Sequence, residues 1–95
     1  MLEIHNNKIY WNRDSCHLAL PKDKKGFIAW LERASLCILL NSKDVTLHRY
    51  KQYKIYRKVS IVLTHEETVQ SAEDFISIPE YKLVSFIEEL KKAIC

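Results

Sequence analysis

The sequence predicts an α+β fold with a single domain over residues 1–95. In this fold a mainly antiparallel sheet of five to seven strands carries two amphipathic helices, at about 24–34 and 79–93, packed on one face. Three observations favour it. A chain of 95 residues has the usual size of one domain. Apolar residues recur at helical spacing in two segments, and short apolar runs separated by short turns fill most of the rest.

The N-terminal segment predicts three short strands. The stretch "LEIHNNKIYW", residues 2–11, has two apolar runs on either side of Asn6 and Asn7. Asparagine tolerates a positive φ, so this pair suits a tight hairpin turn. Over residues 16–20 apolar residues alternate with polar or small ones, and Pro21 ends this third strand.

The stretch "DKKGFIAWLERAS" predicts a helix over about 24–34. The carboxylate of Asp23 can cap its N-terminus. Apolar residues at the i, i+3, i+4 and i+7 positions indicate one buried face. These residues are Phe27, Trp30, Leu31 and Ala34.

The following runs predict the centre of the sheet. The run "SLCILL", residues 35–40, is almost continuously apolar and has the length of a strand, so we expect a strand buried on both faces. A turn at 41–44 leads to a predicted strand at 45–50, and residues 53–64 predict the longest strand. Along this strand the even-numbered residues, from Lys54 onward, share one face.

The C-terminal third predicts a loop, a strand and the second helix. Residues 65–74 are rich in acids and read as a loop, and "FISI", residues 75–78, predicts a short strand. Pro79 suits the first turn of a helix, because its missing N–H would have no partner there. The buried stripe of the helix at about 79–93 comprises Leu83, Phe86, Ile87, Leu90 and Ile94.

Charge is distributed unevenly along the chain, although the net charge is only +3. Residues 1–44 have seven basic and five acidic side chains, residues 45–64 have five basic and none acidic, and residues 65–95 have three basic and seven acidic. A basic middle therefore precedes an acidic tail. The single glycine, Gly26, excludes the glycine-rich phosphate-binding loops of P-loop and dinucleotide-binding proteins.

The basic stretch "HRYKQYKIYRK", residues 48–58, predicts a surface that binds single-stranded nucleic acid. Lysine and arginine contact phosphates, and tyrosine rings stack on exposed bases. The simpler alternative is that Tyr53 and Ile55 belong to the core while the lysines are merely solvated. The residues predicted to contact nucleic acid are Arg49, Tyr50, Lys51, Lys54, Tyr56, Arg57 and Lys58.

The rival interpretation is a protein-interaction or regulatory module, such as an accessory protein of a virus or mobile element. The basic strand and the acidic tail would then meet a protein partner, or the second subunit of a homodimer. Separated blocks of opposite charge favour complementary association of this kind.

The stretch "FISIPEYKLVSFIEELKKAI", residues 75–94, resembles the closing strand–helix unit of Whirly- and PUR-type single-stranded nucleic-acid-binding domains. Those families end a curved antiparallel sheet with a strand, a small residue followed by proline, and an amphipathic helix. The matching positions are residues 76–79, Phe86 and Leu90, in about a fifth of the chain. The helix at 24–34 departs from those families. The resemblance implies only a fold that presents its sheet to single strands, often as a dimer.

No catalytic residue, metal site or cofactor is predicted, and an enzyme is the third interpretation. It depends on two fragments, the adjacent Cys16 and His17 and the acidic loop that starts at His65. A zinc site needs four ligands, usually in closely spaced pairs, and the chain has no CxxC pair.

The cysteine content and the apolar runs predict a cytoplasmic protein with no membrane span. Three cysteines, Cys16, Cys37 and Cys95, are an odd number and indicate free thiols in a reducing compartment. The first residues are polar and lack the apolar run of a signal peptide. No stretch approaches the roughly 20 apolar residues of a membrane-spanning helix.

Overall fold

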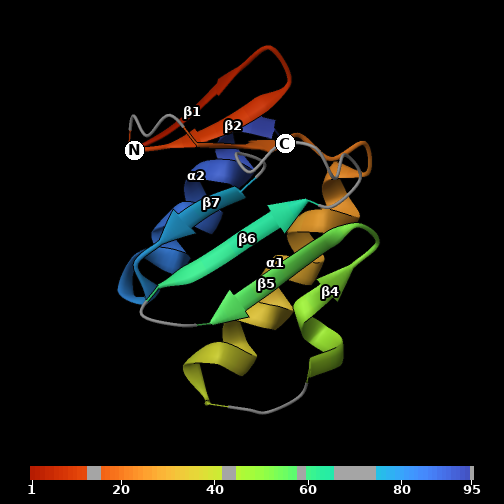
Figure 1. The fold of residues 1–95 in the computed structure, drawn as a ribbon, viewed down its shortest axis with the longest axis vertical. Coiled ribbons are helices and arrows are strands. Elements are labelled where there is room, and N and C mark those ends of the chain that lie inside the picture. The colour runs from red at the N-terminus through yellow and green to blue at the C-terminus, as the bar shows by residue number, and fades with distance from the viewer. Residues whose placement is uncertain (13–15, 42–44, 58–59, 66–74, 95) are drawn as a thin grey trace.

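Seven strands form two antiparallel sheets in the part of the chain that the computed structural model describes (Figure 1). The described residues are 1–12, 16–41, 45–57, 60–65 and 75–94. One sheet has the order β1 (Leu2–His5), β2 (Lys8–Trp11) and β3 (His17–Ala19). The other has the order β4 (Arg49–Tyr50), β5 (Tyr53–Arg57), β6 (Ile61–His65) and β7 (Phe75–Ile78). The α+β class and the antiparallel pairing are confirmed, but the strands do not form the single sheet that was predicted.

The hairpin between β1 and β2 confirms the turn predicted at the two asparagines. Asn6 has a φ of 51° and Asn7 a φ of 61°, the pair of positive values that a type I′ turn requires. His5 lies opposite Lys8, so two residues connect the strands. The predicted third strand forms β3, which pairs with β2.

Helix α1 (Lys24–Leu39) is longer than predicted, because it continues through most of the run expected to be a central strand. Asp23 caps its N-terminus as predicted, and the carboxylate accepts the N–H of Gly26 at 3.1 Å. In the second half Ile38 extends the buried stripe, whereas Leu36 and Leu39 face outward. The helical period is not visible in the sequence here, because nearly every residue of this run is apolar. No glycine or proline interrupts the helix within the run.

Residues 45–64 also differ from the prediction. Residues 45–48 form a 3₁₀ helix, η1 (Val45–His48), and only Arg49 and Tyr50 form a strand. The expected long strand is two antiparallel strands, β5 and β6, in which Arg57 lies opposite Ile61. Odd-numbered residues of β5 pair with odd-numbered residues of β6, and paired residues share a face, so the inward-facing positions are odd-numbered in both strands. The alternation therefore does not show where one strand ends and the next begins. No glycine, proline or asparagine marks that point either.

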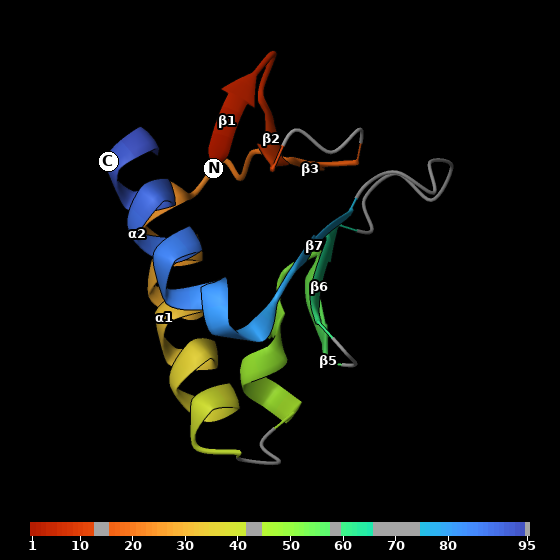
Figure 2. The same ribbon diagram turned by 90° about the vertical axis from the view of Figure 1, so that its left-hand side faces the viewer.

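The predicted C-terminal helix forms as η2 (Glu80–Lys82) followed by α2 (Leu83–Ile94), directly after Pro79. Figure 2 shows α1 and α2 side by side on one side of the four-stranded sheet, with the three-stranded sheet at one end. Neither of these helices has both the length and the apolar character that crossing a membrane requires, in the residues that were searched.

One apolar core joins both sheets and both helices. The ring of Trp11 in β2 meets Phe86 in α2 edge-to-face, with centroids 5.3 Å apart, which ties the three-stranded sheet to the helices. Phe27 in α1 lies 4.7 Å from Tyr53 in β5, between centroids, which ties the helices to the other sheet. The four-stranded sheet therefore has one side in the core, and its opposite side carries the candidate site described next.

Candidate nucleic-acid interface

The side of the four-stranded sheet that points away from the helices, called the outer face, is built by strand register. Arg49 in β4 lies opposite Lys54 in β5, and Tyr56 lies two residues farther along β5 on the same side. The register of β6 and β7 completes two rows across the sheet. The described residues of the outer face are Arg49, Lys54, Tyr56, Val62, Thr64, Phe75 and Ser77.

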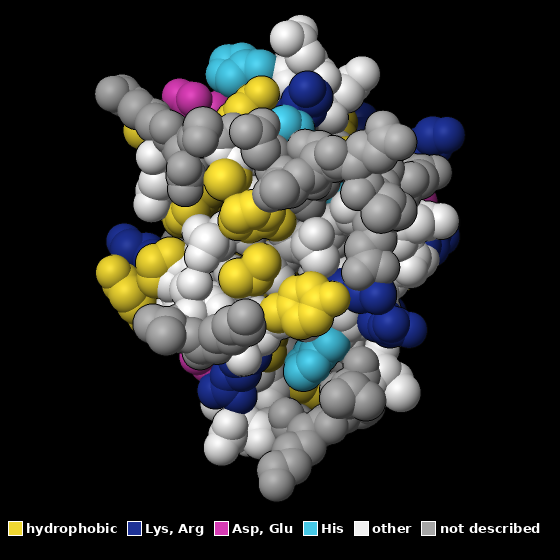
Figure 3. Space-filling model, viewed as in Figure 1, with side chains coloured by type: hydrophobic (Ala, Val, Ile, Leu, Met, Phe, Trp, Pro, Cys, Tyr) yellow, Lys and Arg dark blue, Asp and Glu magenta, His cyan; other side chains and the backbone are white. Residues whose placement is uncertain are grey.

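The outer face combines aromatic, apolar and basic side chains. Tyr56 is 46% exposed, and the hollow beside it has a volume of about 180 Å³ and is lined by His48, Arg49, Lys54, Ile55 and Tyr56. Figure 3 shows this face, with dark blue basic side chains next to a cluster of hydrophobic ones. None of its described strand residues is acidic. This arrangement suits a polyanion that carries stacking groups.

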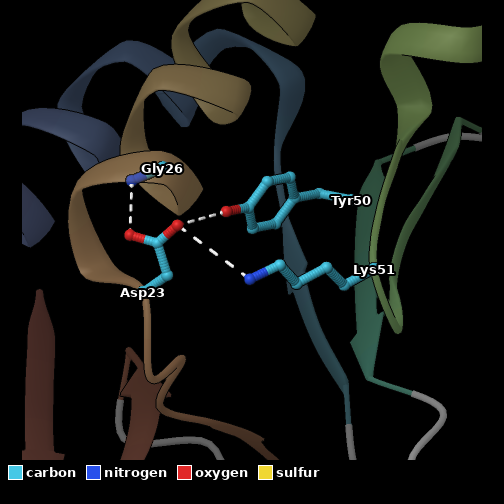
Figure 4. Close-up of polar contacts among 4 residues, drawn as sticks. All are labelled: Asp23, Gly26, Tyr50 and Lys51. Carbon is cyan, nitrogen blue, oxygen red and sulfur yellow. Dashed lines mark hydrogen bonds and ion pairs between the residues drawn. The ribbon is translucent and has the colours of Figure 1, made fainter.

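Tyr50, which was predicted to share this surface, faces the helices. It lies opposite Tyr53 rather than Lys54, and its ring stacks on Trp30 with centroids 5.7 Å apart. Its hydroxyl donates to the Asp23 carboxylate at 2.7 Å (Figure 4). Because Tyr50 pairs with Tyr53 across a two-residue turn, Arg49 and not Tyr50 shares the face of Lys54.

The hydrogen bond between Tyr50 and Asp23 couples the two side chains electrostatically. It is the main cause that lowers the pKa of Asp23, and the N–H of Gly26 adds to it. The same bond raises the pKa of the Tyr50 hydroxyl. A Cβ atom at residue 26 would collide with the side chains of both Asp23 and Tyr50. The only glycine of the chain therefore lies where the N-terminus of α1 approaches β4. Tyr50 therefore acts as a structural contact.

Two predicted cations interact with acids of their own chain. The Lys51 ammonium lies 4.0 Å from the Asp23 carboxylate, as Figure 4 shows. Arg57 donates to Glu80 at 2.7 Å and to Asn41 at 2.9 Å. Their charge is therefore partly neutralised, and neither belongs to the outer face.

Of the predicted contact residues, the structure thus brings together Arg49, Lys54 and Tyr56. Lys58 lies outside the described residues. Sequence reasoning did not include Phe75 in the site, although the register brings it into the row of Lys54. The position of Phe75 follows only from the pairing of β6 with β7, which the sequence alone does not show.

The sequence fragments considered for metal binding or catalysis lie in different parts of the fold, as far as the structure describes them. His65 ends β6 and is buried, 4.5 Å from the Tyr53 ring between centroids, rather than lying in a loop. His17 lies 5.7 Å from the Tyr10 ring in the other sheet. The described residues contain no group of three or more His, Cys, Asp or Glu placed to hold a metal ion. Residues 66–74 of the acidic loop lie outside them.

Comparison of the chain with protein-family models, with curated proteins and with solved structures finds no match.

Proposed function

We propose that this protein is a binding module without catalysis of its own, which holds single-stranded nucleic acid on the outer face of β4–β7. The observation that carries the proposal is the register that places Arg49 opposite Lys54, with Tyr56 next to them on the same side. It puts two cations and one exposed ring on the same face of the sheet.

Each of these residues has a role that its chemistry supports. Arg49 and Lys54 contact successive phosphates as the strand crosses the sheet. The ring of Tyr56 stacks on an unpaired base, a contact worth about 1–3 kcal/mol. Phe75, half-buried at the end of the Lys54 row, gives a second apolar surface for a neighbouring base. Paired bases do not present their faces in this way, so the surface favours single strands.

Two phosphate contacts set the expected strength of the salt dependence. For single strands the slope of log affinity against log salt is about −0.7 per contact, so Arg49 and Lys54 give about −1.4. Binding is then weak and easiest to detect at low ionic strength.

Fluorescence anisotropy with labelled single- and double-stranded oligonucleotides, at low and moderate salt, tests the proposal. We expect salt-sensitive binding that is stronger for single strands and that Lys54→Glu weakens. Lys92→Glu is the matched control, because it makes the same charge change at an exposed position on α2, behind the sheet. Absence of binding at low salt, or equal loss in both variants, would contradict the proposed site.

A further inference from the structure

Lysines gather where the start of α1 meets the turn between β4 and β5. Lys22 and Lys51 line one hollow there, which has a volume of about 160 Å³. Lys24 and Lys25 lie in the first turn of α1, and all four side chains are exposed. These residues, Lys22, Lys24, Lys25 and Lys51, are called the lysine cluster. A basic patch of this kind is the electrostatic footprint of a polyanion.

The lysine cluster keeps most of its charge. Asp23 is the only acid among the described residues that line the hollow, and its carboxylate already accepts the Gly26 N–H and the Tyr50 hydroxyl. Lys51 lies 4.0 Å from this carboxylate, and both side chains are at least half exposed, so solvent screens the ion pair. Four lysines and one acid leave a charge of +3, as large as the net charge of the whole chain.

The cluster is held next to the outer face. Lys51 belongs to the two-residue turn that follows β4, an edge strand of its sheet. Arg49 of the outer face lies two residues before it, at most about 7 Å away between Cα atoms. The hydrogen bond from Tyr50 to Asp23 fixes this turn against the start of α1 (Figure 4). In Figure 3, further dark blue side chains lie along the right-hand edge, where Figure 1 places the turn and the start of α1.

We propose that a single strand on the outer face continues past β4 onto the lysine cluster, where Lys22 and Lys25 contact further phosphates. This inference rests on the function proposed for the outer face. Lys22 lines the hollow beside Lys51, and Lys25 precedes Gly26, where α1 meets the Tyr50 hydroxyl. The outer face supplies the stacking ring, whereas the cluster supplies backbone contacts that do not depend on base sequence.

The longer path makes the salt dependence grow with the length of the strand. A short strand of about 5 nucleotides covers the outer face alone, and a long strand of about 12 also reaches the cluster, within the site sizes of about 4–16 known for single-strand binders. At about 0.7 per contact, Lys22 and Lys25 steepen the slope of log affinity against log salt by about 1.4 for the long strand. Between about 50 and 200 mM salt, this difference is a further loss of affinity of about 7-fold.

Fluorescence anisotropy with both labelled strands over this salt range tests the longer path. The double variant Lys22→Gln/Lys25→Gln should return the slope of the long strand to that of the short one, and should leave the affinity of the short strand unchanged. Both residues are exposed, so the melting curve of the variant should match that of the wild type.

Arg33→Gln/Lys82→Gln is the matched control, because it removes the same charge at two exposed positions away from the cluster. Arg33 lies about 12 Å beyond Lys25 along α1. Lys82 is in η2, close to Val84, which shares a groove with Leu39 at the opposite end of α1. The control should keep the wild-type slope with both strands.

Equal slopes for the two strands in the wild type, or a long-strand slope that the cluster variant leaves unchanged, would overturn the longer path. An equal loss of slope in the control would do the same. Failure of the outer face itself has another signature: the short strand would not bind, or its binding would not respond to Lys54→Glu. That result would also remove the surface from which the longer path starts.

Discussion

The two sides of β4 and β5 carry the same kinds of side chain and put them to different uses. On the helix side, Tyr50 and Tyr53 are held by ring contacts and hydrogen bonds. On the outer face, Tyr56 is 46% exposed beside the basic pair Arg49 and Lys54. Strand register alone separates them. A tyrosine in a basic segment therefore stabilises the fold or remains available to a ligand according to which side it takes.

Two other cations of the basic segment lie close to acids of the chain itself. Arg57 and Lys51 lie close to Glu80 and Asp23, respectively, within the chain. A basic stretch therefore overstates the charge that a ligand would meet.

The strongest test of this division is Tyr53→Ala. The ring is 5% exposed and its hydroxyl donates to the backbone carbonyl of Ala19 at 2.6 Å. Removing a buried aromatic side chain lowers the free energy of unfolding by about 3–5 kcal/mol, which urea denaturation measures. Tyr53→Phe, which loses only the hydrogen bond, should cost about 1 kcal/mol. A small effect of the alanine variant would show that this side of β5 is not the structural one.

Tyr56→Ala should have the opposite signature. Because the ring is exposed, stability should change by no more than about 0.5 kcal/mol. Affinity for a single-stranded oligonucleotide should fall by about 1–3 kcal/mol, or roughly 5- to 150-fold, as a stacking contact is lost. Anisotropy titration checks this, with Tyr56→Phe as a control that keeps the ring. Unchanged affinity in Tyr56→Ala would remove this residue from the site.

A smaller effect is expected at Asp23, and it depends on pH. The hydrogen bond from Tyr50 lowers the pKa of this carboxyl, so its stabilising contribution is complete at neutral pH. It is lost as pH falls from the unfolded value near about 4 through the lower folded value. Asp23→Ala should lower the melting temperature at pH 7 and flatten the acid side of the profile, as thermal unfolding across pH would show.

Tyr50→Phe provides the matching alkaline test. The raised pKa means that the protonated hydroxyl is favoured in the fold, so its contribution is full at neutral pH and is lost above about pH 10. The variant should lose that alkaline decline. If its profile matched the wild type at both ends, the contact between the helix start and β4 would be energetically silent.

The smallest expected effects distinguish Arg57, which pairs with Glu80, from Arg49, which is proposed to contact phosphate. Arg57→Ala removes a partly exposed ion pair with Glu80 and should cost about 0.2–1 kcal/mol of stability. Its salt slope for oligonucleotide binding should equal the wild-type slope. Arg49→Ala should leave stability nearly unchanged and make the slope shallower by about 0.7. Equal slopes for the two variants would mean that both cations, or neither, contact phosphate.

Local chemistry was predictable wherever a few neighbouring residues decide the structure. Asn6 and Asn7 adopt the positive φ that their turn needs, and Asp23 caps α1. The strand, proline and helix of 75–94 form as expected, because the apolar stripe of that helix is unambiguous. Residues 35–40 were misassigned because an almost continuously apolar run shows no helical period.

By itself the sequence determined the α+β class, the first hairpin, the start of α1 and a basic, tyrosine-bearing segment with no acid. Tertiary structure decided how that segment divides. Pairing Arg49 with Lys54 turns Tyr50 inward, and the β5–β6 hairpin leaves Tyr56 outward. It also left Leu36 exposed between the two helices. The reason is physical: alternation and helical period limit which residues share a face, but only the packing of distant segments decides which face is buried.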